Sequence, residues 1–214
     1  MQGTGAEIRI ELASALLEIG AFLFSPDELF TWASGIRSPV YCDNRLVLGA
    51  PAARKAVTRG FVRLYRSLDP QPDVVVGTAT AGIPHAAWLA SELDLPMGYV
   101  RSSAKAYGRT RILEGIRPQG QRALVVEDLV STGRSSIAAV RALREEGLIA
   151  DTVAAIFSYG LPAAEQAFAS ADCTLKTLTT LDDLLAVAVA GARLSTDDAE
   201  RIRSWRRDLQ PERV

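Results

Sequence analysis

A regular alternation of apolar strands and amphipathic helices begins near residue 73 and constrains the fold more than any other feature. Continuous apolar runs at 74–76 and 123–126 are typical of strands that are buried on both faces. Further strands are expected at 97–101, 152–157 and 173–178, and helices at 83–93, at 163–170 and around Ile137, Val140 and Leu143. This order predicts an α/β fold in which helices flank a central parallel sheet.

The first 45 residues do not follow this alternation. A helix is expected at 6–19, and short β-prone pieces, broken by Ser-Gly and Ser-Pro, lie between residues 23 and 44. We expect them to form a small lobe beside the sheet. Helices are also expected at 51–68, near 181–190 and at 196–209. One structural unit with three parts is therefore predicted: an N-terminal segment (1–45), a core (46–190) and a C-terminal helix (191–214).

Composition excludes several functional classes. The 214 residues carry 24 Lys and Arg against 25 Asp and Glu, so the chain has no overall attraction to nucleic acid. No apolar run approaches the roughly 18 residues that span a bilayer, and charges interrupt the first apolar stretch, so neither a membrane protein nor a signal peptide is expected. Cys42 and Cys173 lie far apart, which fits a reduced cytoplasmic protein. The single histidine, His85, removes most zinc sites and catalytic triads and is expected to pack in the interior.

The strongest local motif is ALVVEDLVSTGRS at 123–135. A buried strand ends in Glu127 and Asp128, and a turn of small polar residues then leads into a helix. Backbone N–H groups and hydroxyls at a helix N-terminus bind phosphate, and the acids can accept hydrogen bonds from sugar hydroxyls. The motif therefore favours a phosphorylated sugar, and the alternative is a capped helix beside two solvated acids. Neither a Walker A loop nor a G-x-G-x-x-G fingerprint is present.

Two further segments follow strands of the same expected sheet. The segment GTATAGIP at 77–84 has glycines that allow a close backbone approach to an anion, or simply form a tight turn. The segment at 101–115 carries four cations and one acid, and it is either a mobile cationic lid or a solvated surface loop. Because ligands of such sheets bind beyond the carboxyl ends of the strands, the loops at 77–83, 102–115 and 127–135 are expected on one rim.

Together these motifs resemble the type I phosphoribosyltransferases. The segment FTWASGIRSPVYCDNR at 30–45 is similar to the N-terminal segment of the members that act on orotate, as are GTATAGIPHAA and the lid RSSAKAYG. The resemblance covers residues 8 to 190 and implies the type I phosphoribosyltransferase fold, with the N-terminal segment as a small hood over the base. It implies transfer of ribose 5-phosphate from phosphoribosyl pyrophosphate (PRPP) to orotate in pyrimidine (UMP) biosynthesis, with Mg²⁺ carried mainly by PRPP and no direct side-chain ligand for the metal.

The same resemblance implies roles for individual residues. Glu127, Asp128 and Lys105 are the expected catalytic residues, with the two acids on the ribose hydroxyls. Orotate is expected at Ser131 and Arg37. The residues expected to bind PRPP are Thr78, Thr80, Ala81, Gly82, Arg101, Lys105, Tyr107, Glu127, Asp128, Leu129, Val130, Ser131, Thr132, Gly133, Arg134 and Ser135. A homodimer is expected, in which the lid lysine reaches the neighbouring subunit's site.

Some positions depart from the family pattern. Many relatives have histidine where Tyr107 stands, and some have lysine where Ala33, Ala81 or Ser102 stands. Tyr107 can donate a hydrogen bond to pyrophosphate but cannot carry a positive charge there. Arg37 and Arg45 are both candidates for the orotate carboxylate. Two alternatives remain at this point: a phosphoribosyltransferase for another base, and a non-enzymatic regulator on the same fold.

Overall fold

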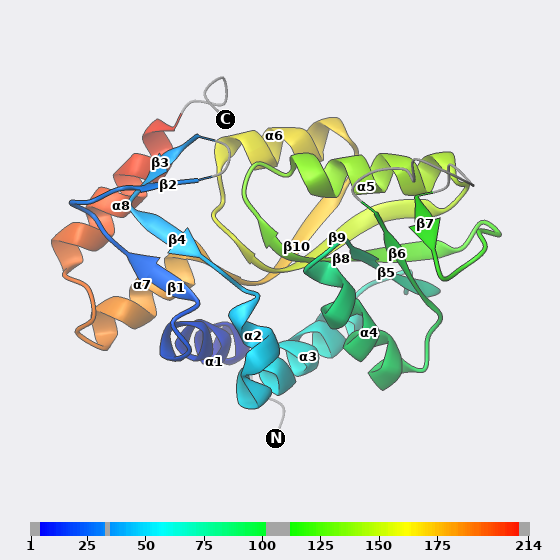
Figure 1. Ribbon diagram of the computed structural model, residues 1–214, viewed down its shortest axis with the longest axis horizontal. Helices are drawn as coiled ribbons and strands as arrows, with labels where there is room; N and C mark the ends of the chain where they lie inside the picture. Colours follow the sequence, from blue (N-terminus) through cyan, green and yellow to red (C-terminus); the bar gives the residue numbers. More distant parts are fainter. Residues whose placement is uncertain (1–4, 33–34, 102–111, 210–214) are drawn as a thin grey trace.

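A six-stranded sheet forms the centre of the computed structural model, which describes residues 5–32, 35–101 and 112–209 (Figure 1). Its strand order is β10-β9-β8-β5-β6-β7, and every pair is parallel except β6 with β7. The strands are β5 (Val74–Thr78), β6 (Met97–Val100), β7 (Leu113–Glu114), β8 (Arg122–Val130), β9 (Ile149–Ser158) and β10 (Thr174–Thr180). The predicted α/β fold with a central, mostly parallel sheet is confirmed.

Helices cover both faces of this sheet. One face carries α1 (Gly5–Glu18), α3 (Pro51–Arg66), α4 (Gly82–Leu93) and α7 (Leu181–Ala190), and the other carries α5 (Arg134–Glu145) and α6 (Pro162–Ser170). Alternate residues of β8 serve the two layers: Leu124 and Val126 pack with the first set, and Ala123 and Val125 with the second. All four are fully buried, which explains the continuous apolar run in the sequence.

The hood, residues 21–44, lies beside the sheet and consists of two small antiparallel pairs. Strand β1 (Phe22–Phe24) pairs with β4 (Val40–Cys42), and β2 (Phe30–Thr31) pairs with β3 (Arg37–Ser38). The helix α1 that precedes the hood instead packs against α3, α7 and β10 of the core. A short helix, α2 (Leu46–Gly49), then leads into α3. The division of the chain at residues 45 and 190 stays a prediction.

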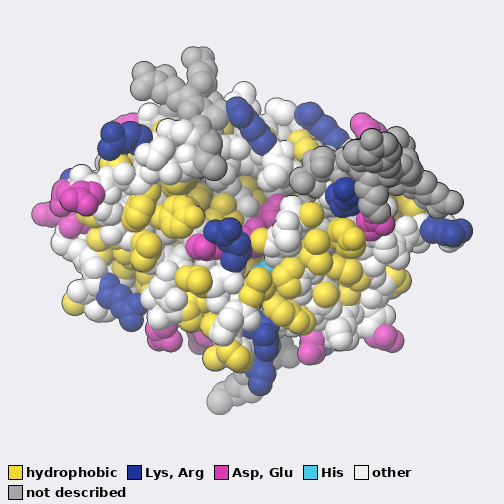
Figure 2. Space-filling model, viewed as in Figure 1, with side chains coloured by type: hydrophobic (Ala, Val, Ile, Leu, Met, Phe, Trp, Pro, Cys, Tyr) yellow, Lys and Arg dark blue, Asp and Glu magenta, His cyan; other side chains and the backbone are white. Residues whose placement is uncertain are grey.

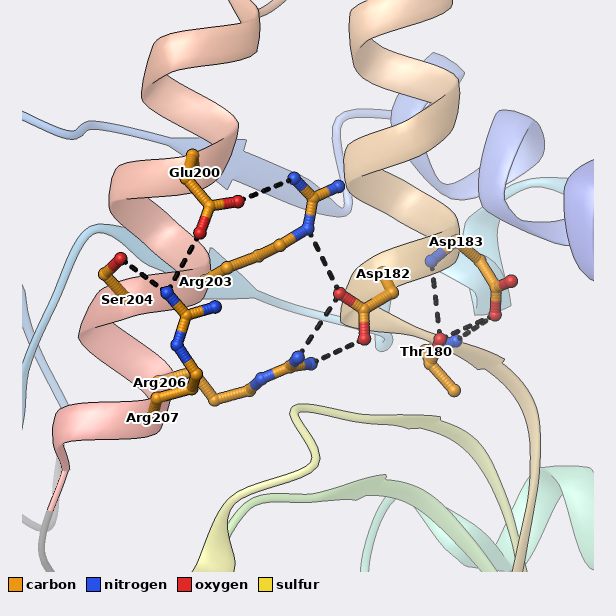
Figure 3. A network of polar contacts seen from close by, with 8 residues as sticks. All are labelled: Thr180, Asp182, Asp183, Glu200, Arg203, Ser204, Arg206 and Arg207. Atoms are coloured by element: carbon orange, nitrogen blue, oxygen red, sulfur yellow. Dashed lines mark hydrogen bonds and ion pairs between the residues drawn. The ribbon is translucent and has the colours of Figure 1, made fainter.

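The last helix, α8 (Thr196–Asp208), joins the core to the hood. Figure 3 shows Arg206 and Arg203 of α8 reaching Asp182 at the start of α7, with the Arg206 Nη1 to Asp182 Oδ2 distance at 2.9 Å. Arg207 and Arg203 also contact Glu200 of their own helix. The cluster of arginines in this tail therefore finds acidic partners within the chain. No helix among the described residues is long and apolar enough to cross a bilayer.

The sheet differs from the sequence-based expectation at two places. Strand β8 does not end at Glu127 and Asp128 but continues to Val130, because Leu129 and Val130 still pair with Phe157 and Ser158 of β9. A two-residue strand, β7, also forms at Leu113–Glu114 and pairs with the end of β6. No periodicity in the sequence indicated this short edge strand.

Candidate functional site

The segments that follow β5, β6 and β8 meet at one edge of the sheet. Residue Thr78 is paired with Val100, and Gly77 with Val126, so the three strands reach this edge together. The backbone N–H of Ala79 donates a hydrogen bond to the carbonyl of Val100 at 2.8 Å. This places the Thr78–Gly82 segment, Arg101 and the acid pair at the carboxyl ends of neighbouring parallel strands, where α/β sheets bind ligands.

Two adjacent acids, Glu127 and Asp128, lie in the middle of this edge. The Glu127 side chain is only 6% exposed. Its Oε2 accepts a hydrogen bond from the Ser136 hydroxyl at 3.4 Å, and its Oε1 accepts one from the backbone N–H of Asp128 at 3.1 Å. Burial, together with the negative charge of Asp128, raises the pKa of Glu127 to about 8. Burial also raises the pKa of Asp128. The pair therefore retains a proton near neutral pH and can both donate and accept hydrogen bonds.

The turn after the acids leads directly into α5. Gly133 has a φ of +79° and stands immediately before the first helical residue, Arg134. A Cβ at this glycine would also lie 3.0 Å from the ring of Phe168. Both the positive φ and the lack of space therefore favour glycine at this position. Thr132 is buried, Ser131 is half-buried, and Arg134 and Ser135 are exposed. The first backbone N–H groups of α5 thus face the same edge as the acids, where an anion can accept their hydrogen bonds.

The segment after β5 approaches β8 very closely. The Thr78 hydroxyl donates a hydrogen bond to the carbonyl of Val126 at 3.2 Å. A Cβ on Gly82 would lie 2.4 Å from that carbonyl oxygen and 2.5 Å from Thr78 Oγ1, so only glycine fits. Thr80 is exposed and Ala81 is half-buried, and Gly82 begins α4. The helix then carries His85 into the interior, where it is 2% exposed.

Of the cationic residues expected at this edge, the structure describes Arg101 but not Lys105. Arg101 follows β6 and is half-buried. Its Nη1 atom is fully buried and has no hydrogen-bond partner among the described residues, so the guanidinium retains donors for a ligand. Lys105 and Tyr107, together with Ser102, lie outside the described residues, as does Ala33.

The two arginines considered for the orotate carboxylate occupy different places. Arg37 is on hood strand β3 with an exposed side chain, and within the described ranges no hydrogen bond or ion pair joins that side chain to the three segments. Arg45 follows the hood and forms a two-point ion pair with Asp43, at 2.6 and 2.8 Å. Its charge also lowers the pKa of Asp128, although burial raises that pKa overall. Of these two arginines, Arg45 is therefore the one whose charge acts on Asp128.

Two residues that sequence reasoning missed contact the acid pair directly. Ser136, in the first turn of α5, donates to Glu127. The Asn44 side chain donates a hydrogen bond to the backbone carbonyl of Asp128 at 2.7 Å, from 84 positions earlier in the chain. Ser136 follows the phosphate motif and could have been included with it. Nothing in the local pattern around Asn44 indicated a long-range contact.

The described part of this edge shows no cluster of metal-ligating side chains. Among residues 5–32, 35–101 and 112–209, no three His, Cys, Asp or Glu side chains gather in a way that could hold an ion. Figure 2 shows the face viewed in Figure 1, with acidic and basic side chains between two areas of apolar side chains.

Comparison with known proteins agrees with this arrangement. Residues 47–157 match the phosphoribosyl transferase domain family. The orotate phosphoribosyltransferase of Bacillus caldolyticus is 48% identical over 92% of this chain and 95% of its own length. That of Staphylococcus aureus is 45% identical over 93% of this chain and 98% of its own. The chain belongs to the orotate phosphoribosyltransferase family.

A solved structure supports the same assignment. The orotate phosphoribosyltransferase of Aeropyrum pernix superposes with a TM-score of 0.73 at 31% identity, covering 86% of this chain and 99% of its own. The resemblance based on the sequence motifs is therefore confirmed for the family and the fold.

Proposed function

We propose that this protein transfers ribose 5-phosphate from PRPP to orotate, which gives orotidine 5′-phosphate and pyrophosphate. The observation that carries the proposal is the adjacent pair of buried Glu127 and half-buried Asp128, placed shortly before the N-terminus of α5 at the sheet edge. A ribose 5-phosphate fits this arrangement because its hydroxyls and its phosphate need an acid pair and an anion site a few ångströms apart. The high identity to orotate phosphoribosyltransferases over nearly the whole chain selects orotate as the acceptor.

Different residues would bind the phosphate, the ribose and the pyrophosphate of PRPP. The 5-phosphate would bind at Ser131–Ser135, with Leu129 and Val130 leading into that turn. Glu127 and Asp128 would hold the ribose hydroxyls. The pyrophosphate would lie between the Thr78–Gly82 segment, Arg101 and the lid residues Lys105 and Tyr107. As pyrophosphate leaves the anomeric carbon, the centre becomes oxocarbenium-like, so cations on the leaving group and acids on the sugar stabilise the transition state.

Mg²⁺ is the metal we propose to accompany PRPP. Bound to the substrate oxygens, it would neutralise negative charge on the pyrophosphate. Oxygen ligands from a substrate suit Mg²⁺, which is usually held by few protein carboxylates. Glu127 and Asp128 are the acidic side chains at this edge that could add a ligand, but their burial and raised pKa values favour sugar contacts over metal ligation.

Orotate would bind beneath the hood, near Ser131. Loss of its N1 proton to solvent water would make the ring an anionic nucleophile, and N1 would then attack the anomeric carbon as the bond to pyrophosphate breaks. Its carboxylate needs a cation, and Arg37 is our proposed partner, with Arg45 as the alternative. In the hood, the Trp32 ring lies 4.4 Å from the Tyr159 ring and its Nε1 donates to the Val40 carbonyl, so this tryptophan packs internally and supports the hood.

The assembly and location of the protein follow from the same proposal. We propose a cytoplasmic enzyme of pyrimidine (UMP) biosynthesis, which forms a homodimer in which the lid carries Lys105 to the neighbouring subunit's site. Both cysteines are free thiols, in keeping with a reducing compartment. The apolar side chains on the face in Figure 2 would be available to such a partner.

The ultraviolet absorbance of orotate, followed with purified protein, PRPP and Mg²⁺, tests the reaction. Parallel samples contain uracil, adenine, hypoxanthine or xanthine. Consumption of orotate alone is expected. Consumption of a different base would retain the PRPP site and overturn the assignment of the acceptor. Binding of PRPP without turnover of any base would instead support a regulatory protein.

A further inference from the structure

The side chain of Asn44 connects the hood to the acid pair. It is 1% exposed, and its Nδ2 donates a hydrogen bond to the backbone carbonyl of Asp128 at 2.7 Å. Its Oδ1 accepts a hydrogen bond from the Cys42 thiol at 3.2 Å. Both ends of the amide are thus occupied, and the side chain cannot rotate without leaving a buried polar group unpaired.

The chain around Asn44 is itself fixed on both sides. The backbone N–H of Cys42 donates to the Tyr159 hydroxyl at 3.0 Å, and that of Asp43 donates to the Ala21 carbonyl at 2.8 Å. The backbone N–H of Tyr159 in turn contacts the Val130 carbonyl at 3.3 Å, two residues beyond Asp128. The end of β4 is therefore bound to the ends of β8 and β9. Asn44 is the member of this group that reaches the backbone of the acid pair itself.

We propose that Asn44 is a positioning residue, which fixes the Asp128 backbone and thereby the two acids for the ribose of PRPP. The carbonyl that it holds belongs to the acidic residue, and the backbone N–H of the same residue is bound to Glu127. Asn44 thus holds the peptide group on the C-terminal side of the Asp128 Cα, and the Glu127 carboxyl binds the peptide group on its N-terminal side. The backbone that carries the Asp128 carboxyl is therefore restrained on both sides. This role of Asn44 rests on the proposed function, in which the two acids bind the ribose of PRPP. It adds to the site a residue of the hood.

Kinetics of two Asn44 variants test this role. Asn44→Leu keeps the branched shape with a somewhat larger side chain and removes both hydrogen bonds. Asn44→Asp keeps the shape and the acceptor but loses the donor to the Asp128 carbonyl at neutral pH. We expect the KM for PRPP to rise about 10-fold in each, which corresponds to the loss of one buried hydrogen bond. The KM for orotate is expected to stay close to that of the wild-type protein.

Tyr159→Phe is the matched control. It removes the hydroxyl that accepts from Cys42, so it leaves a buried N–H unpaired in the same group, but it keeps the bond from Asn44 to Asp128. We expect it to lower the melting temperature as Asn44→Leu does, with an unchanged KM for PRPP.

A KM for PRPP that is unchanged in Asn44→Leu and Asn44→Asp, or one raised equally in Tyr159→Phe, would overturn the positioning role. Should Asn44→Leu fail to fold, Asn44→Asp decides by the same criterion, and direct PRPP binding by that variant can replace turnover. Wild-type protein in the same assay separates the two proposals, because orotate consumption by the wild type upholds the function whatever the variants do.

Discussion

The Nε1 of Trp205 donates a hydrogen bond to the carbonyl oxygen of Arg37 across 2.9 Å, and this contact joins the last helix to the hood. The Trp205 ring also lies edge-on to Trp32, with 5.9 Å between the ring centroids. On its other side, α8 is held to α7 by the ion pair between Arg206 and Asp182 (Figure 3). The C-terminal helix α8 therefore packs against the hood, and the hydrogen bond from Trp205 helps to fix the backbone at Arg37.

Replacement of Trp205 by phenylalanine is expected to raise the KM for orotate severalfold and to leave the KM for PRPP unchanged. The ring contact with Trp32 is largely kept, but the hydrogen bond to Arg37 is lost, which removes about 1 kcal/mol of support for the hood. Steady-state kinetics with each substrate varied in turn measures the effect. Arg207→Ala is the control, because Arg207 contacts Glu200 and Ser204 of its own helix and, in the part of the hood that the structure describes, has no hydrogen bond or ion pair. Equal effects of both changes would contradict this role of Trp205.

Removal of the Glu127 charge should change how stability depends on pH. The pKa of this carboxyl rises from 4.5 to about 8 on folding, so the folded chain binds one proton more than the unfolded chain between these values. Its contribution to stability is therefore full below pH 4.5 and is lost as the pH rises through 8. Glu127→Gln, which cannot ionise, is expected to flatten the fall in melting temperature between pH 5 and pH 9.

Thermal unfolding of wild-type protein and Glu127→Gln, measured across this pH range, provides the comparison. Glu165→Gln is a suitable control, because Glu165 is an exposed acid in the first turn of α6. A wild-type protein whose stability rises steadily from pH 6 to pH 9, relative to Glu127→Gln, would disprove the raised pKa. Turnover by the glutamine variant is expected to fall, because the pair can no longer accept and donate in the same arrangement.

The buried His85 gives the opposite dependence on pH. Burial lowers its pKa to about 4, and neither ring nitrogen has a hydrogen-bond partner among the described residues. In the unfolded chain the His85 imidazole takes up a proton near pH 6.5, whereas in the folded chain it stays neutral down to about pH 4. The free energy of unfolding therefore falls as the pH drops from 6.5 to 4. His85→Phe is expected to lessen this loss, since the side chain lies between Phe61 and Trp88. Melting temperatures at pH 5 and pH 7.5 measure it, and an equal acid loss in both proteins would refute the assignment.

The longer strands of the sheet and the glycine turn before α5 could be predicted from the sequence because their signals are local. The continuous apolar run at Ala123–Val126 indicates a strand that is buried on both faces. The glycine and hydroxyl residues after it predict an anion site, and this signal does not depend on contacts with distant parts of the chain. The end of β8 could not be placed, since Leu129 and Val130 are held in the strand by partners in β9. The contacts from Asn44 to Asp128 and from Trp205 to Arg37 were not predictable either. They join positions 84 and 168 residues apart, and no periodicity records such pairs.

The close approach at Gly82 predicts a large effect from a single methyl group. In Gly82→Ala, the added Cβ would meet the Val126 carbonyl oxygen at 2.4 Å, so β5, β8 or α4 must shift. Overpacking of this kind costs about 1–3 kcal/mol, and the shift would displace the acid next to Val126. We expect a lower melting temperature and at least a 10-fold loss of turnover, since misplacement by about 1 Å can cost 100-fold. Gly49→Ala is the control, because a Cβ there meets nothing within 4 Å, and an equal effect of both would show that the close approach is unimportant.

A mixture of two inactive variants tests whether subunits share their sites. If Lys105 neutralises the leaving group in the transition state, as we propose, Lys105→Ala is expected to reduce turnover far more than it weakens PRPP binding. Asp128→Ala removes an acid that stays in its own subunit. If the lid serves the neighbouring site, a mixed dimer contains one site with both defects and one with neither, so mixing equal amounts restores up to about a quarter of wild-type activity when subunits exchange freely. Each variant mixed with itself is the control, and activity that stays at the level of the separate variants, in dimers shown to have exchanged, would place the lysine in its own subunit's site.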